Sequence, residues 1–149
     1  MTKCYIFDID GTLADCSHRL HHIQKQPKDW DAFFAETYND APIPHMVELF
    51  TLVTEYGRAK FVFVSGRPDR TRNATIQWLQ DHLPMWGEPR LYMRTDGDRR
   101  DDDIVKMELL AQLRADGFEP IMVFDDRTRV VNAWRAAGVP CAQVAPGDF

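Results

Sequence analysis

The chain has few cysteines and no long apolar run, and both features limit the classes of protein to which it can belong. Its three cysteines, Cys4, Cys16 and Cys141, are far apart and form no CxxC pair. Such spacing is typical of reduced thiols in a cytosolic protein and argues against a disulfide framework. No apolar stretch approaches the roughly 20 residues that a membrane-spanning helix needs. Asp8 also interrupts the first apolar run too early for a signal peptide. We therefore expect a cytoplasmic protein without a membrane partner.

Positive charge is also scarce, with 18 Lys and Arg against 23 Asp and Glu and a net charge of −5. Proteins that grip long duplex DNA through counterion release are usually basic, so this balance disfavours that mode of binding. It leaves open the recognition of a nucleic-acid end, for which a few local Arg or Lys residues are enough. It also leaves open a bound cation that neutralises some of the acids.

No internal repeat or low-complexity segment is present, and 149 residues is the length of about one domain. Short β-branched or aromatic runs alternate with segments of helical periodicity, which is typical of a parallel sheet built from βαβ units. Strands are expected at 4–9, 60–65, 90–93, 120–124 and 141–144. Helices are expected at about 30–37, 45–56, 69–82, 103–116 and 128–137. We predict a single α/β domain over 1–149, with a small helical, cap-like insertion at about 13–44 after the first strand.

Two carboxylates, Asp8 and Asp10, follow the first apolar strand in the sequence FDIDGTL. Ligands of open α/β sheets bind outside the carboxyl ends of the strands, where these side chains should lie. Gly11 allows the backbone to turn sharply and to approach a ligand closely. A DxD pair alone is common in loops, but a pair between a buried strand and Gly-Thr-Leu is far more specific. The motif indicates a site of phosphoryl transfer.

A second apolar strand ends in Ser65, Gly66 and Arg67. A serine hydroxyl and the neighbouring backbone N–H groups can hold a phosphate oxygen. An ordinary Ser-Gly turn is the alternative interpretation, and the motif alone does not separate the two.

Two further motifs follow the aspartate pair and the Ser-Gly-Arg motif along the chain. Lys106 lies near the start of a helix otherwise devoted to core packing, and alone it would be read as a surface lysine. Asp125 and Asp126 end a buried strand, where two adjacent acids are costly unless they bind something. A hard cation with oxygen ligands is the natural partner. All four motifs should meet at one edge of the sheet.

In this order, DxDGT, SGR, Lys and DD, the motifs resemble the haloacid dehalogenase superfamily of phosphotransferases over nearly the whole chain. The position of Arg19, the stretch 94–106 and the segment 125–149 are similar to the 3′-phosphatase domain of the phage polynucleotide kinase-phosphatase. The resemblance implies a Rossmann-like three-layer fold with a central parallel sheet. Two departures stand out. No GxxxxGK[ST] loop is present, so we expect these residues to contain no kinase half, and the insertion is richer in histidine than the family pattern.

The resemblance also implies a Mg²⁺-dependent phosphomonoesterase. Asp8 would attack phosphorus and form an aspartyl-phosphate. Asp10 would protonate the leaving oxygen and then activate water, and we expect repulsion from Asp8 to raise its pKa. Ser65 and Lys106 would hold the transferring oxygens. The implied Mg²⁺ ligands are Asp8, Asp10 through its carbonyl, Asp125 and Asp126.

Six residues are implied in substrate binding, namely Thr12, Arg19, Gly66, Arg67, Arg94 and Asp102. A planar guanidinium can grip a phosphate in a bidentate manner, although each arginine could instead be solvated or ion-paired. Thr12 is expected to assist the phosphate or the Asp10 side chain, and Asp102 to orient Lys106.

Two features of the insertion stay open. The three histidines of segment 18–22 could bind a transition metal, but their spacing favours a solvated loop. Trp30, Phe33 and Phe34 could stack nucleobases. Their spacing of i, i+3, i+4 instead favours the buried face of a small helix.

The substrates that fit best are 3′-phosphorylated DNA or RNA ends, because a small insertion leaves the site open to a polymer. A small-molecule phosphatase such as a nucleotidase is the alternative. An inactive binding module ranks last, because it predicts the loss of at least one of the catalytic groups and all are present. The resemblance further suggests a kinase or ligase partner acting in trans, and a phage-encoded protein in the host cytoplasm as one origin.

Overall fold

The central sheet of this computed structural model, which describes residues 1–149, has five parallel strands in the order β5-β4-β1-β6-β7. The strands are β1 Thr2–Phe7, β4 Lys60–Pro68, β5 Leu91–Arg94, β6 Phe118–Asp125 and β7 Cys141–Gln143. The predicted α/β class with a parallel sheet is confirmed. The first strand begins and ends two residues earlier than expected, because Thr2 already pairs with Phe118.

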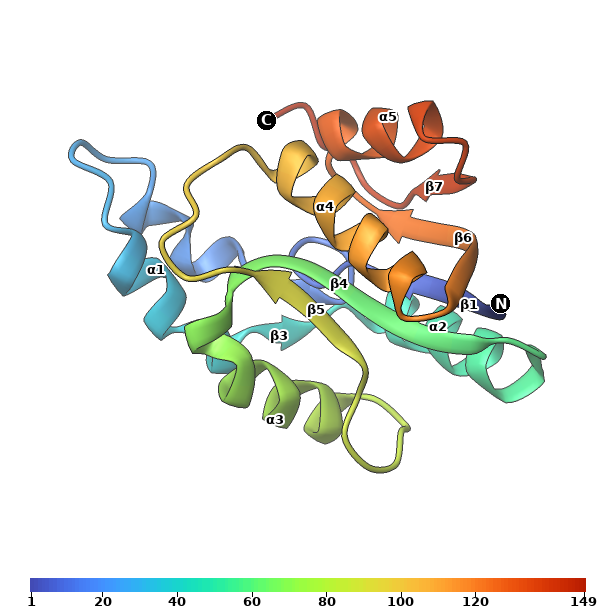
Figure 1. Cartoon of the computed structure of the whole chain (residues 1–149). Helices are drawn as coiled ribbons and strands as arrows, with labels where there is room; N and C mark the ends of the chain where they lie inside the picture. Colours follow the sequence, from blue (N-terminus) through green and yellow to red (C-terminus); the bar gives the residue numbers. More distant parts are fainter.

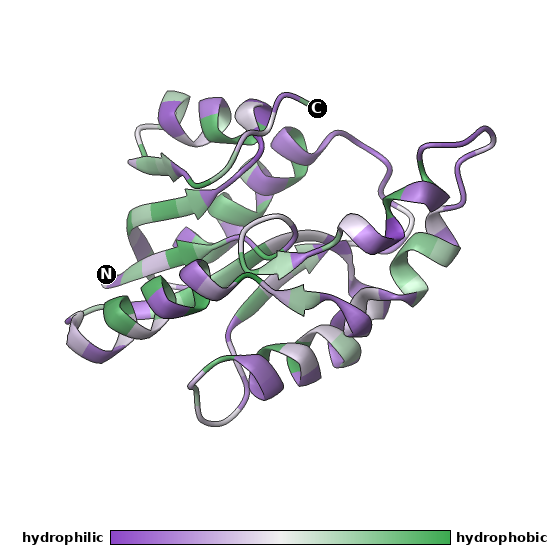
Figure 2. Ribbon diagram, turned by 180° about the vertical axis from the view of Figure 1, so that it is seen from behind, coloured by the Kyte–Doolittle hydropathy of each residue, from purple (hydrophilic) through white to green (hydrophobic).

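Helices cover both faces of the sheet, which gives three layers (Figure 1). They are α2 Pro44–Tyr56 and α3 Arg72–His82 on one face, and α4 Asp102–Ala115 and α5 Thr128–Ala136 on the other. Neighbouring residues of β1 serve different layers, since Ile6 packs with α4 and α5 and Phe7 with α2 and α3. The central strands are accordingly mostly apolar (Figure 2), as expected for strands buried on both faces.

Strand β4 is longer than predicted and includes the Ser-Gly-Arg motif. Pro68 still pairs with Arg94 of β5, and the register shifts between Ser65 and Pro68. Such an irregularity bends a strand and redirects its side chains. The motif is therefore part of an irregular strand end, and helix α3 starts later than predicted because the 3₁₀ turn η3 Asp69–Thr71 precedes it.

The segment between β1 and α2 is closed at its base by two short antiparallel strands, β2 Ala14–Asp15 and β3 Ala41–Pro42. Between them lie η1 Ser17–His22, α1 Trp30–Ala35 and η2 Thr37–Asn39. Helix α1 lies on the side toward which the sheet strands point (Figure 1). The two-residue strands were not predicted because they are too short to show a period. The interpretation of segment 13–44 as a cap stays a prediction.

Strand β1 lies at the centre of the sheet, with β4 and β5 on one side and β6 and β7 on the other. The chain therefore reverses its direction of travel across the sheet at β1, and ligands bind at such switch points, outside the carboxyl ends of the strands. Asp8 and Asp10 follow the end of β1 at this point. None of the helices is both long and apolar enough to span a bilayer.

Candidate active site

Three buried carboxylates meet at the carboxyl ends of β1 and β6. Oxygen atoms of Asp8, Asp125 and Asp126 all lie within 4.8 Å of one another. The sheet brings them together, because Phe7 pairs with Phe124 and each is followed by an aspartate. We call these three residues the carboxylate cluster.

Lys106 of α4 supplies the only ammonium in contact with this cluster. Its Nζ donates to Asp8 Oδ1 and to Asp125 Oδ2, each at 2.8 Å, and the side chain is 2% exposed. Burial lowers the pKa of Lys106, but attraction to Asp125 and Asp8 outweighs it, and the pKa lies well above its ordinary value. Burial, followed by repulsion from Asp125, raises the pKa of Asp8.

The cluster fits a divalent cation. When all three carboxylates are ionised, they carry two more negative charges than the single ammonium balances in this buried site. Oxygen donors are those that Mg²⁺ prefers. Gly11 has a positive φ of 78°, and a Cβ atom there would overlap the Asp126 carboxylate. Only glycine lets the loop after β1 come this close to Asp126.

A second network joins two carboxylates to two guanidiniums, those of Asp10, Asp40, Arg19 and Arg67. Asp10 Oδ1 accepts from Arg19 Nη2 at 2.8 Å and from Arg67 Nε and Nη2 at 2.9 and 2.6 Å. Both guanidiniums also reach Asp40 Oδ2, at 2.8 and 3.0 Å. Unlike the carboxylate cluster, this network is balanced in charge. We call it the arginine network.

The arginine network contradicts one expectation. Burial raises the pKa of Asp10, but the charges and hydrogen bonds of Arg67 and Arg19 outweigh burial and hold the pKa below its ordinary value. The expected rise through repulsion from Asp8 is therefore wrong. Its Oδ2 atom accepts no hydrogen bond, and the side chain stays 27% exposed.

Two smaller groups of the predicted site also lie at this edge. Thr12 Oγ1 donates to Asp8 Oδ2 at 2.9 Å, so the hydroxyl orients Asp8 rather than Asp10. Ser65 is buried, and its Oγ accepts from the backbone N–H of Arg67 at 3.1 Å. A Cβ atom at Gly66 would overlap the Asp102 carboxylate, so the irregular end of β4 packs tightly against α4.

Arg94, the last residue of β5, forms an ion pair with Asp102, the first residue of α4. Arg94 Nε donates to the Gly66 carbonyl at 2.7 Å, and its Nη2 donates to Asp102 Oδ1 at 2.7 Å. Its Nη1 donates to carbonyl oxygens of the loop before α4. With all of these contacts Arg94 orders the loop, and Asp102 acts on Lys106 through its charge without a hydrogen bond. Contact of either residue with a substrate stays a prediction.

Asp40 is the main residue that sequence reasoning missed. Its carboxylate is fully buried, accepts from both guanidiniums and from His18 Nε2 at 2.7 Å, and its carbonyl accepts from Trp78 Nε1. A single aspartate in a polar segment carries no local motif. The only signal was the charge balance, since Arg19 and Arg67 need a second acid beside Asp10.

The histidines of the insertion do not converge on a metal site. His18 pairs with Asp40 and, at 3.6 Å, with Glu36, whereas His22 Nε2 donates to Glu36 Oε1 at 3.0 Å. The His21 ring lies tilted against the His22 ring, and its Nδ1 contacts the His18 carbonyl. All three histidines therefore contact groups of their own segment, and His18 and His22 pair with carboxylates there.

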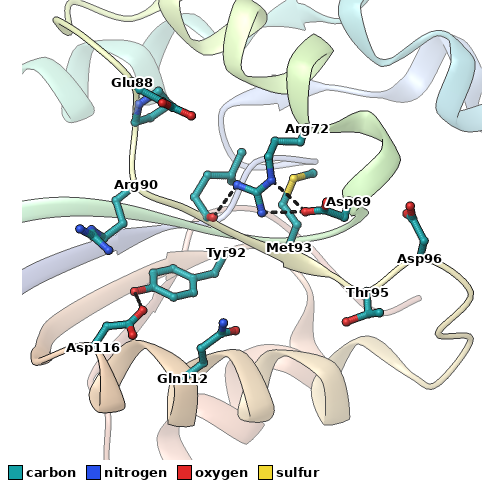
Figure 3. Close-up of a pocket in the computed structure, with 12 residues that line it drawn as sticks. Asp69, Arg72, Glu88, Arg90, Tyr92, Met93, Thr95, Asp96, Gln112 and Asp116 are labelled. Carbon is teal, nitrogen blue, oxygen red and sulfur yellow. Dashed lines mark hydrogen bonds and ion pairs between the residues drawn. The ribbon is translucent and has the colours of Figure 1, made fainter.

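A separate hollow of about 730 Å³ lies beside the edge strand β5 (Figure 3). Arg72 spans it with bonds to Asp69 and to the Leu91 carbonyl, and the Tyr92 hydroxyl donates to Asp116. None of its lining residues belongs to the carboxylate cluster or the arginine network. The hollow is thus distinct from the candidate active site.

Comparisons with known proteins agree with this geometry. A family model described as the polynucleotide kinase PNKP phosphatase domain matches residues 2–149. A putative bifunctional polynucleotide kinase/RNA ligase of Autographa californica nuclear polyhedrosis virus is 25% identical over 138 residues. The match covers 93% of this chain and 18% of the viral protein.

Solved structures agree as well. A chain of the Pnkp1/Rnl/Hen1 complex superposes with a TM-score of 0.82 at 27% identity, over 100% of this chain and 48% of that chain. The class C acid phosphatase from Bacillus anthracis, with a TM-score of 0.68 and 14% identity over 99% of this chain and 67% of that one, shows the shared fold. This chain therefore spans less than half of the viral relative and of the complex subunit.

The substitution Lys106→Met tests the balance of charge in the cluster. It leaves three buried carboxylates without a cation, so we expect the free energy of unfolding to fall by about 3–5 kcal/mol. Urea unfolding at neutral pH without divalent cations measures this. Arg129→Met is the matched control, since Arg129 pairs with Asp101 and Asp103 at the surface and exposed pairs contribute little. Equal losses for the two variants would contradict the assignment.

Proposed function

Because this chain belongs to the family of polynucleotide kinase phosphatase domains, within the haloacid dehalogenase superfamily, we propose that it removes 3′-phosphates from nucleic-acid ends through an aspartyl-phosphate at Asp8. That the chain is a phosphatase of the hydrolase class follows from the family. The observation that best supports the proposed chemistry is the carboxylate cluster at the switch point of the sheet. In this cluster the buried Asp8 carboxylate contacts Lys106. The ionised cluster carries more negative charge than Lys106 balances, which favours a bound cation.

In the first step an oxygen of Asp8 attacks phosphorus, and the bond from phosphorus to the 3′-oxygen breaks. The protonated form of Asp10, which is the minor form in the free protein because Arg67 and Arg19 lower its pKa, donates a proton from Oδ2 to the leaving oxygen, which departs as a hydroxyl. Its other oxygen, Oδ1, is fixed by Arg19 and Arg67, so the free oxygen faces a defined direction.

In the second step water attacks phosphorus of the aspartyl-phosphate, and the bond to Asp8 breaks. Asp10 accepts the proton of the water, for which the ionised form favoured by Arg67 and Arg19 is suited. Lys106 has three N–H donors and uses two on Asp8 and Asp125, so the third can hold a phosphate oxygen together with Ser65.

We propose Mg²⁺ as the cofactor. Its ligands would be Asp8, Asp125 and Asp126, whose oxygens lie together, and, as the resemblance implies, the Asp10 carbonyl. A cation bound there neutralises the repulsion between a carboxylate nucleophile and a phosphate dianion. The donor set supports this choice because it contains only oxygen.

The proposed substrate rests on the relatives. One structural neighbour is described as part of an RNA repair complex, and the viral relative as a putative polynucleotide kinase/RNA ligase. Both favour nucleic-acid ends and a kinase or ligase partner, and we expect the protein to act in the cytoplasm. Thr12, Arg19, Gly66, Arg67, Arg94 and Asp102 stay the proposed substrate-side residues.

A panel of substrates tests the proposed function. We expect kcat/KM for a 3′-phosphorylated oligonucleotide to exceed that for the matching nucleoside 3′-monophosphate by at least about tenfold, which corresponds to about 1.4 kcal/mol. Phosphate release from DNA and RNA strands of one sequence measures it. Parity, or a preference for the mononucleotide, would favour a nucleotidase instead.

Asp8→Asn removes the nucleophile with little change in shape. We expect kcat to fall by at least about 10³-fold, because a residue whose covalent bond defines the reaction path has no substitute. A single-turnover phosphate assay measures the loss, and circular dichroism should show that the variant still unfolds cooperatively. Retained activity would remove Asp8 as the nucleophile.

Removal of divalent cations should stop turnover. We expect EDTA to abolish phosphate release and Mg²⁺ to restore it. Mg²⁺ at about 100 times its Kd should also stabilise the wild-type fold by about 2.7 kcal/mol in thermal unfolding. Asp126→Asn, which weakens the cluster, should lose most of this stabilisation. Turnover that is indifferent to EDTA would refute the assignment of the metal.

A further inference from the structure

The aromatic residues of α1 divide between the core and the surface. Phe33 is buried and Phe34 is half-buried, whereas Trp30 is 46% exposed. The expectation that the three residues form a buried face is therefore confirmed for Phe33, holds in part for Phe34 and is wrong for Trp30. A helix of this length presents only part of its circumference to the core, and Trp30 lies outside that part.

Trp30 is held in place by its aromatic neighbours. Its ring stacks on Phe34 with a centroid distance of 5.8 Å and an interplanar angle of 22°. It meets Phe33 edge-on at 5.7 Å and 90°. Such contacts restrict the ring without covering it, so the exposed surface is available in a defined orientation.

The same aromatic group reaches the arginine network. The Arg19 guanidinium lies over the Phe33 ring at 4.3 Å, and Arg19 Nη2 donates to Asp10. The exposed indole is thus separated from a guanidinium of the candidate active site by a single ring. Helix α1, which carries Trp30, lies on the side of the sheet where the carboxyl ends of the strands lie (Figure 1).

Two exposed cations each lie over one of these rings. Lys28 Nζ lies 5.8 Å from the centre of the Trp30 ring, and the Arg70 guanidinium lies 5.4 Å from the centre of Phe34. Arg70 follows Arg67 by three residues, and its backbone N–H donates to Asp96 in the loop before α4. Arg70 pairs with Asp31, but that pair is exposed and is easily exchanged for a phosphodiester.

Single exposed apolar residues are ordinary, and Trp86, 98% exposed on the loop between α3 and β5, is such a residue. Trp30 differs in that its ring packs on Phe34, has the Lys28 ammonium over it and is separated from Arg19 of the arginine network by one ring. An aromatic face next to basic side chains is how proteins bind single-stranded nucleic acid.

We propose that Trp30 is a stacking site for a nucleobase near the 3′-phosphate of a single-stranded end, with Lys28 and Arg70 facing the adjoining phosphodiester. This inference rests on the proposed function, because the stacked base belongs to the same strand whose 3′-phosphate is removed. A base in a duplex has both faces covered by its neighbours, so the site selects unpaired ends. Stacking accepts every base, so little sequence preference is expected.

Trp30→Leu tests the stacking site, because leucine keeps an apolar contact with Phe33 and Phe34 but has no aromatic face. We expect kcat/KM for a 3′-phosphorylated single-stranded oligonucleotide to fall roughly 5- to 150-fold, the range that base–aromatic stacking implies. Turnover of glycerol phosphate, which has no base, should not change. Trp30→Phe should keep most of the oligonucleotide activity, and the matched control Trp86→Leu should keep all of it.

Two outcomes would overturn the inference. Equal losses on the oligonucleotide and on glycerol phosphate would mean that Trp30 only supports α1, and unchanged activity on both would mean that no stacking site exists. Failure of the proposed function itself is seen in the wild type, as an absence of preference for oligonucleotides. In that case fluorescence anisotropy with a single strand ending in a 3′-hydroxyl still decides, since an equal Kd for wild type and Trp30→Leu overturns the stacking site.

Discussion

The structure depends on one electrostatic constraint, namely that three carboxylates are buried together against a single ammonium. Parallel pairing of β1 with β6 places Asp8 beside Asp125, and α4 carries Lys106 to both. Charges of one sign are costly to bury without partners. The close approach of Gly11 to Asp126 tightens the group further. When these carboxylates are ionised, the site is short of positive charge, which the proposed divalent cation would supply.

The arginine network gives the insertion a role in the candidate active site. Arg19 and Asp40 come from the insertion, whereas Asp10 and Arg67 come from the ends of β1 and β4. Trp78 of α3 fixes the Asp40 carbonyl, so the network is anchored to the core on both sides. The insertion therefore completes the setting of Asp10, and changes far from the carboxylate cluster can alter the position of that residue.

Much of the fold was predictable from the sequence because its apolar residues follow clear strand and helix patterns. The parallel strands are nearly continuous apolar runs, and the helices between them repeat apolar residues every three to four positions. The meeting of Asp8, Lys106 and Asp125 followed from their places at strand ends and in the intervening helix. The lowered pKa of Asp10 and the part of Asp40 were not predictable, because both depend on contacts between distant segments. The exposure of Trp30 was missed for a related reason, since spacing shows which residues share a face but not how much of that face is covered.

The family and the geometry both indicate a phosphatase, and covalent attack by Asp8 is the central claim of this account. Rapid acid quenching of the enzyme with a 3′-phosphorylated substrate, followed by peptide mass spectrometry, tests it most directly. The account predicts a phosphoryl group on the peptide that contains Asp8, convertible to homoserine by borohydride reduction of the acyl-phosphate. Turnover that proceeds with no phosphoryl group on Asp8 at any time, or with one on another residue, would contradict it.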